Sequence, residues 1–114
     1  MIDIIIQEVG EYCVVSLHEM ISSSRKGNLV KARQLIFYFA RELTQMSLAD
    51  IGSVLFRDHA TVMHGERMVR NYIQTYDIYK KEVEILRSRI EEAIRHYTLP
   101  CNEVFMENDF FTNN

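Results

Sequence analysis

The stretch SLADIGSVLFRDHATVMHG, residues 47–65, contains two helix starts separated by only a short turn. Ser47 suits the N-cap of a first helix, because Asp50 follows three residues later and completes a start similar to a capping box. Asp58, or the residue before it, suits the N-cap of a second helix, so the first helix should not extend past Phe56. Two helices that meet across so tight a turn have the spacing of a helix-turn-helix.

The second of these helices has two different faces. An inward apolar seam is predicted at Val62, Gly65, Val69 and Ile73, and an outward seam at Ala60, His64, Arg67 and Asn71. The first turn is polar or small as well, and Gly65 permits close approach of another helix. Such a helix fits an element that reads a DNA groove.

The rest of the chain is predicted to be helical, which gives an all-α fold class: a helix bundle that contains the helix-turn-helix. One-sided apolar spacing predicts helices at residues 2–13 and 29–43, and SSSRKGN at residues 22–28 predicts a loop. In the 29–43 helix, an exposed stripe is expected at Lys31, Gln34, Tyr38 and Arg41.

Residues 76–97 have heptad-like apolar spacing, at Tyr79, Val83, Leu86, Ile90, Ala93 and Tyr97. The stretch is short for a coiled coil, so we interpret it as a terminal helix. We expect Tyr79, Val83, Leu86 and Ile90 to be buried against the N-terminal helices or against a second copy of the chain. Residues 76–97 are thus also the candidate surface for a protein partner or self-association.

A chain of 114 residues, 47% of them hydrophobic, is enough for one domain. Pro100 ends the last predicted helix. We therefore expect a helix-turn-helix domain at residues 1–99 and an acidic, aromatic tail at residues 100–114, which is predicted to be mobile. Residues 101–114 are expected to be dispensable for DNA binding.

Charge is distributed unevenly along the chain. The formal net charge is −3, yet residues 25–70 hold eight basic and four acidic side chains, a local net charge of +4. Residues 1–24 have four acidic side chains and no lysine or arginine. The middle of the chain can therefore produce a local positive field although the whole chain is acidic, and a solvated mixed-charge surface is the alternative interpretation.

Other classes of function find little support. The two cysteines are far apart and the start has no basic segment before its apolar residues, so we expect a reduced, soluble, intracellular protein without a signal peptide or membrane span. The four glycines are scattered, which argues against a nucleotide site. His59 and His64 are five residues apart, whereas helical metal motifs use four, and no catalytic set can be assembled. We expect no enzyme, no cofactor and no metal.

The run SRKGNLVKARQLIFYFARELTQMSLADIGSVLFRDHATVMHGERMV, residues 24–69, resembles the C-terminal DNA-binding domain of the bacterial chromosomal replication initiator, DnaA. The resemblance covers about residues 5–95, and its most specific pieces are KARQLIFYFARELT, SLADIG and RDHATVMHG. They correspond to the packed central helix, the first helix of the helix-turn-helix and the signature of the recognition helix. Their order and spacing imply the fold of that family, which is similar to that of the Trp repressor.

The resemblance also implies two sets of residues at a DNA interface. The base-contacting set is Arg25, in the minor groove at an A·T-rich end of the site, with Ala49, Asp58, His59, Ala60 and Thr61. The phosphate-contacting set is Lys26, Arg33, Gln34, Arg41, Arg57, His64 and Arg67. The chemistry agrees, because a carboxylate accepts from cytosine N4 and arginine is favoured in narrow A·T minor grooves.

The sequence departs from the family pattern at several places, and its basic loop also holds fewer arginines than is usual in the family. Ala60 replaces the first of two threonines, Ala49 replaces a proline, and the turn LFRDH is one residue shorter than the usual glycine-containing form. We expect sequence-specific binding of double-stranded DNA at a DnaA-box-like or other short asymmetric site, in the bacterial cytoplasm or nucleoid, as an origin- or operator-binding module in replication initiation or its regulation. The alternative is a protein-interaction module that keeps the fold but has lost specific DNA contact. Whether the chain is a stand-alone relative or an excised domain stays open.

Overall fold

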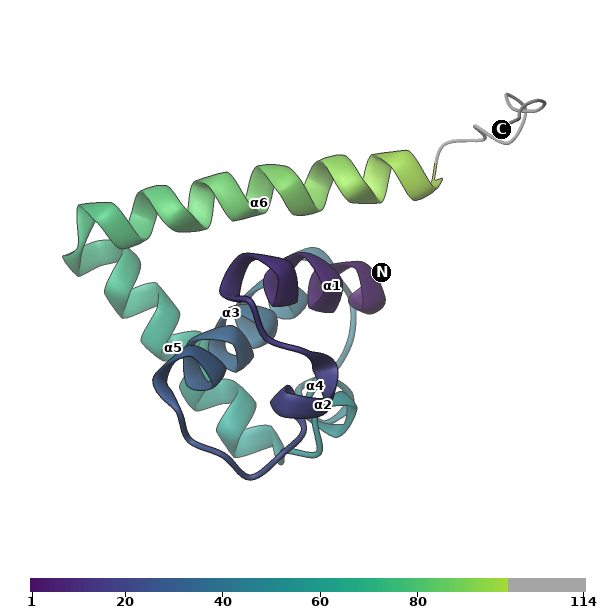
Figure 1. The fold of residues 1–114 in the computed structure, drawn as a ribbon, viewed down its shortest axis with the longest axis vertical. Helices are drawn as coiled ribbons and strands as arrows, with labels where there is room; N and C mark the ends of the chain where they lie inside the picture. The colour runs from purple at the N-terminus through teal and green to yellow at the C-terminus, as the bar shows by residue number, and fades with distance from the viewer. Residues whose placement is uncertain (99–114) are drawn as a thin grey trace.

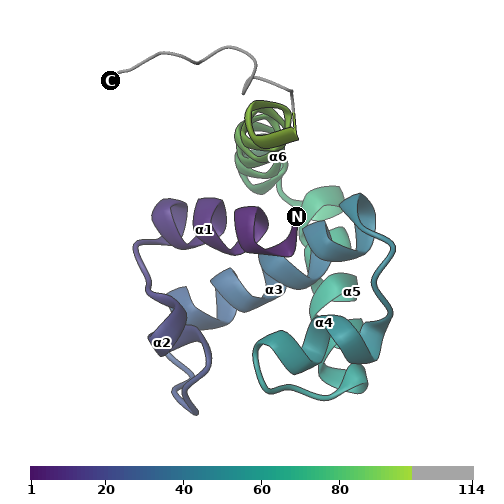
Figure 2. The same cartoon turned by 90° about the vertical axis from the view of Figure 1, so that its right-hand side faces the viewer.

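The computed structural model describes residues 1–98, which fold into six helices and contain no strand. The helices are α1 (Ile2–Cys13), α2 (Leu17–Met20), α3 (Gly27–Leu43), α4 (Leu48–Val54), α5 (His59–Thr75) and α6 (Asp77–Thr98). α6 runs alongside α1 at one end of the molecule (Figure 1). Seen nearly along α6, the loop between α2 and α3 and the turn between α4 and α5 lie at the opposite end (Figure 2). The all-α helix-turn-helix fold is thus confirmed.

α3 lies at the centre of the domain and packs against α1, α2, α4 and α5. Its residues from Leu35 to Ala40 are all buried, so this helix is enclosed on every side rather than on one face. The expected exposure of Tyr38 is therefore wrong. Its hydroxyl donates to the Glu42 carboxylate at 3.2 Å and accepts from Arg87 of α6 at 3.0 Å, and this distant partner covers the ring.

α6 packs on the domain through the predicted seam. Val83, Leu86 and Ile90 are buried and Tyr79 is partly buried in the same core, which confirms packing against α1 and α5. Ion pairs join α6 to its neighbours on both sides of the seam: Lys31 with Glu82, Arg87 with Glu42, and Arg89 with Glu8 and Glu11. Several acidic residues of the N-terminal region and α3 are thus matched by cations of α6.

The helix-turn-helix consists of α4 and α5, and both expected caps are present. The Ser47 hydroxyl accepts from the Asp50 amide at 3.1 Å, and the Asp58 carboxylate accepts from the Thr61 amide at 2.8 Å. Phe56 in the turn has a positive φ of 57°, the conformation that glycine adopts without steric cost. The shorter turn therefore keeps a left-handed residue although its glycine is absent.

Two glycines set the packing of α4 and α5. A Cβ on Gly52 would lie 2.4 Å from the carbonyl oxygen of Arg57, so only glycine lets the turn fold back onto α4. A Cβ on Gly65 would lie 2.8 Å from Cδ2 of Phe37, so α5 approaches α3 closely at this point. Both contacts fix the direction in which α5 leaves the turn.

Some expectations concern features beyond these helices. The tail at 100–114 lies outside the described residues, so the boundary near residue 99 stays a prediction. Within residues 1–98, none of the helices combines the length and apolar character needed to cross a bilayer. The same residues contain no group of three potential metal-binding side chains among histidine, cysteine, aspartate and glutamate.

Candidate nucleic-acid interface

The start of α5 presents a short row of exposed side chains. Asp58, His59, Ala60 and Thr61 are all solvent-exposed, on the helix whose back is formed by the buried Val62. The pKa of the Asp58 carboxyl is lowered, mainly because the backbone amide of Thr61 donates to it. Asp58 therefore remains ionised at neutral pH and combines two features: it caps α5 and presents a carboxylate at the surface.

The loop between α2 and α3, residues 21–26, is called the basic loop here because Arg25 and Lys26 are exposed on it. It is shorter than expected from the sequence, since α3 begins at Gly27. Lys26 occupies the N-cap of α3 without a side-chain capping bond. The two cations therefore stand directly before the central helix of the domain.

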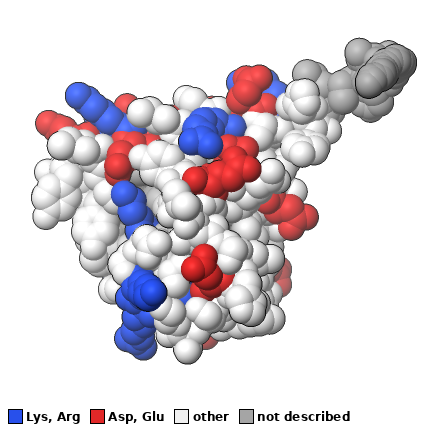
Figure 3. Space-filling view, viewed as in Figure 1, with Lys and Arg blue, Asp and Glu red and all other residues white. Residues whose placement is uncertain are grey.

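Five of the expected contact residues have no ion-pair partner within residues 1–98. Among the described residues, no carboxylate lies within ion-pair distance of five of the expected contact residues: Arg25, Lys26, Arg41, Arg57 and Arg67. In contrast, several cations of α6 are matched by carboxylates, as described above. The space-filling view shows lysine and arginine side chains down the lower left edge and acidic groups across the middle (Figure 3). The five side chains named above thus keep positive charges that no described carboxylate meets at ion-pair distance.

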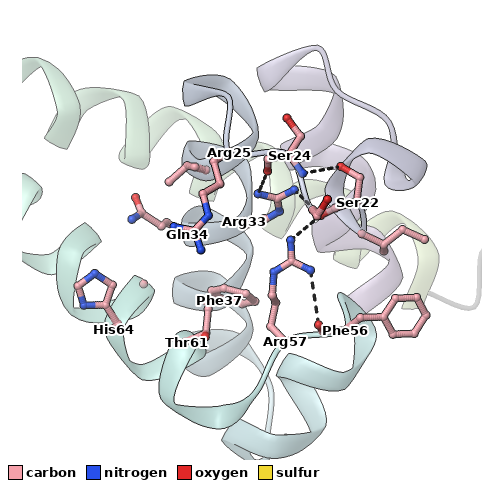
Figure 4. A pocket seen from close by; sticks show the side chains of 14 residues that line it. Ser22, Ser24, Arg25, Arg33, Gln34, Phe37, Phe56, Arg57, Thr61 and His64 are labelled. Atoms are coloured by element: carbon pink, nitrogen blue, oxygen red, sulfur yellow. Dashed lines mark hydrogen bonds between the residues drawn. The ribbon is translucent and has the colours of Figure 1, made fainter.

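A pocket of about 600 Å³ lies between the basic loop, α3 and α5. Arg25 reaches over it from the loop, Gln34 lines it from α3, and Thr61 and His64 line it from α5 (Figure 4). Phe37 forms part of its apolar wall. The pocket joins residues that the resemblance assigned to the minor groove, the major groove and the phosphates, although they are up to 39 positions apart in the sequence.

Other expected contact residues lie outside this pocket. Ala49 is exposed on α4, Arg41 near the end of α3, and Arg67 further along α5. His59 and Ala60 are exposed at the start of α5 but do not line the pocket. The interface expected from the sequence is therefore a surface wider than the pocket.

Arg33 is placed differently from what the phosphate-contacting set implied, because its side chain is only 7% exposed. The guanidinium donates to four backbone carbonyls, those of Glu19, Met20, Ser22 and Ser24, at 2.7 to 3.2 Å. Burial, followed by the nearby charge of Arg57, lowers the pKa of this guanidinium. A phosphate contact would require the Arg33 guanidinium to release these carbonyls. In this structure Arg33 instead anchors the basic loop to α3.

Sequence reasoning missed two aromatic residues at this site. Phe56 is 72% exposed in the turn and lines the pocket together with Phe37. A sequence signal for Phe56 did exist: the turn lacks the glycine that is usual in the family, so another residue has to adopt the positive φ. No local signal points to Phe37, because its place in the pocket depends on how α5 crosses α3.

Comparison with known proteins agrees with this geometry. The family described as the bacterial dnaA protein helix-turn-helix matches residues 2–69, more than half of the chain. The chain belongs to this family. As a member of it, the chain is a helix-turn-helix domain of the DnaA C-terminal type, the DNA-binding class of that initiator.

Three curated relatives share the name chromosomal replication initiator protein DnaA. Over 90 residues, the chain is 40% identical to the protein of Flavobacterium psychrophilum, 36% to that of Lachnoclostridium phytofermentans and 34% to that of Thermoanaerobacter sp.. These alignments cover 78 to 79% of this chain but only 19 to 20% of the relatives. The DnaA-type chain thus spans about a fifth of the length of the relatives it matches.

Proposed function

We propose that this DnaA-type domain binds double-stranded DNA sequence-specifically, as an origin- or operator-binding module in replication initiation or its regulation. The observation that carries the proposal is that the exposed first turn of α5 and the basic loop lie at the same end of the molecule. A helix start of this kind reads base edges in the major groove, while an arginine on a neighbouring loop enters the adjacent minor groove. The target is a DnaA-box-like or other short asymmetric site.

In this proposal Arg25 contacts an A·T-rich minor groove, and Asp58, His59 and Thr61 face the major groove. Ala60 offers a methyl group to a thymine methyl, and Ala49 approaches a base from α4. The phosphate contacts are made by exposed or half-buried residues: Lys26, Gln34, Arg41, His64 and Arg67. Arg33 is omitted from this set because its guanidinium is occupied by the loop carbonyls.

The test compares two single variants on a duplex recovered by selection and on a scrambled duplex. His59→Ala should weaken binding to the selected duplex by about 1–3 kcal/mol and scarcely affect binding to the scrambled duplex, because the His59 side chain is proposed to contact base edges. Arg67→Ala should weaken both by a similar factor and lower the salt slope by roughly one unit, because it meets a phosphate. Ile85→Ala, on the exposed side of α6, is the matched control and should change neither.

The acidic net charge adds a further expectation for the same titrations. Only a few phosphates can be neutralised by the cations available, so the salt dependence should be modest compared with that of strongly basic binders. Equal loss for His59→Ala on both duplexes would contradict base reading. Absence of any duplex binding by the unmodified chain at low salt would overturn the proposal itself.

The alternative, a protein-interaction module, is favoured by one observation. Ile78, Ile85 and Tyr97 of α6 are more than half exposed, although the main apolar seam of this helix is used inside the domain. Self-association or a partner at residues 76–97 would therefore use these side chains rather than the buried seam. Sedimentation of the chain over a range of concentrations, with Ile78→Ser as the comparison, tests this second function.

A further inference from the structure

The side chain of Arg57 bridges the turn of the helix-turn-helix and the basic loop. Its Nη1 donates to the carbonyl of Leu55 in the turn at 2.7 Å, and its Nη2 donates to the carbonyl of Ser22 in the loop at 2.7 Å. The close-up shows the guanidinium directed up toward the loop, away from His64 (Figure 4). One side chain thus connects two segments that are 35 residues apart in the sequence.

The base of this bridge is fixed by the backbone. The amide of Arg57 donates to the carbonyl of Gly52 at 2.8 Å, and the Arg57 carbonyl lies so close to Gly52 that no side chain fits there. The guanidinium therefore extends from a turn residue whose backbone is hydrogen-bonded to Gly52 of α4. A planar guanidinium with its donors in a fixed fork can hold two carbonyls in one geometry.

The far end of the bridge is shared with Arg33. The carbonyl of Ser22 also accepts from Nη2 of Arg33 at 3.0 Å, and Nη1 of Arg33 holds the carbonyl of Ser24 at 2.7 Å. Arg25 follows Ser24 directly. The direction in which Arg25 leaves the loop is consequently set by two guanidinium groups, one fixed in α3 and the other in the turn before α5.

We propose that Arg57 is a positioning residue that fixes the basic loop relative to the recognition helix α5, so that minor-groove and major-groove contacts are made in one register. This inference rests on the proposed DNA binding and departs from the phosphate contact that the resemblance implied for Arg57. Both terminal nitrogens of Arg57 donate to protein carbonyls, whereas a phosphate contact would need them to face outward.

Arg57→Lys separates the two roles, because it keeps the positive charge but offers a single nitrogen that cannot hold both carbonyls in the same geometry. If Arg57 positions the loop, Arg57→Lys should lose the preference for A·T pairs at the end of the site to the extent that Arg25→Ala does. Discrimination that depends on His59 and the salt slope should be unchanged. If Arg57 holds a phosphate, Arg57→Lys should keep the A·T preference and Arg57→Gln should lower the salt slope by roughly one unit, which would overturn the proposal.

The double variant Arg25→Ala/Arg57→Lys gives an independent check. Positioning acts through Arg25, so the double variant should show no further loss of A·T preference beyond Arg25→Ala alone. An additive loss would contradict the inference. Arg70→Lys, at an exposed arginine of α5 that belongs to neither set of DNA contacts, is the matched control for the arginine-to-lysine change and should leave the A·T preference intact.

A measurement without DNA distinguishes failure of this inference from failure of the proposed function. In the free chain, backbone NMR order parameters at residues 22–25 should fall from about 0.85 toward about 0.6 in Arg57→Lys and remain high in Arg70→Lys. Arg57→Gln serves as the second variant if the lysine variant melts early. Unchanged order parameters in a folded Arg57 variant would refute the bridge, whether or not the chain binds DNA.

Discussion

Replacement of Leu86 by alanine tests whether α6 is part of the domain core. Leu86 is 1% exposed and lies close to Tyr12 of α1 and Leu35 of α3. The change removes Cγ and both Cδ atoms, which at about 0.8 kcal/mol per buried CH₂ amounts to roughly 2 kcal/mol of lost transfer free energy. A residual cavity of about 50 Å³ adds roughly 1 kcal/mol, so the expected loss is about 3 kcal/mol within the usual range of about 2–5.

Urea denaturation measured by circular dichroism gives the free energy of unfolding, and gel filtration gives the oligomeric state. Ile85→Ala is the matched control, because Ile85 is the neighbouring residue of α6 but is 57% exposed. It should change the free energy of unfolding by less than about 0.5 kcal/mol. A loss below about 0.5 kcal/mol for Leu86→Ala, without a change in oligomeric state, would refute the packing of α6 on this domain.

Three further changes test local features of the fold. Gly52→Ala should lower the free energy of unfolding by about 1–3 kcal/mol, since the added Cβ meets the Arg57 carbonyl at 2.4 Å, and a neutral result in denaturant would contradict the close turn. Val14→Gly should raise the free energy of unfolding by about 1 kcal/mol, because Val14 is 84% exposed with a φ of 58° at the C-cap of α1; a less stable variant in the same assay would be inconsistent with this. Asp58→Asn should make the free energy of unfolding less dependent on acidic pH. The pKa of the Asp58 carboxyl is lower in the folded chain than its ordinary value of 3.8, so the ionised carboxylate stabilises the fold above pH 3.8, and this stabilisation is lost as pH falls through the folded-state pKa. Denaturation curves at neutral and acidic pH should therefore show that the unmodified chain and Asp58→Asn differ less in free energy of unfolding at acidic pH than at neutral pH. A difference that does not change with pH would contradict the stabilising role of the Asp58 cap.

The sequence predicted those parts of the fold that depend on local chemistry. Ser47 and Asp58 were identifiable as caps because a cap bonds an amide only three residues away. The inward seam of α5 at Val62 and Val69 and the seam of α6 followed from helical periodicity, which depends only on spacing. These features needed no knowledge of what the helices pack against.

Features set by distant partners were not predictable in the same way. Tyr38 has the spacing of an exposed residue, yet Arg87, 49 positions later, covers it. Arg33 and Arg57 are of a residue type that commonly binds phosphate, but in the folded domain their guanidinium groups donate to backbone carbonyls. The sequence does not show whether an arginine side chain faces water or backbone carbonyls, so only the tertiary arrangement distinguishes these roles. The proposed surface around Arg25 and His59 was identifiable through the resemblance and stays a prediction.

The most direct test of the central claim is a selection of bound sequences from random duplexes by the unmodified chain. We expect enrichment of one short asymmetric motif with A·T pairs at one end, and a selection with His59→Ala should lose preference at a position within the major-groove part of that motif. Retention of duplexes without any common motif would contradict sequence-specific reading. Failure to retain any duplex at low salt would contradict DNA binding and leave the protein-interaction alternative in its place.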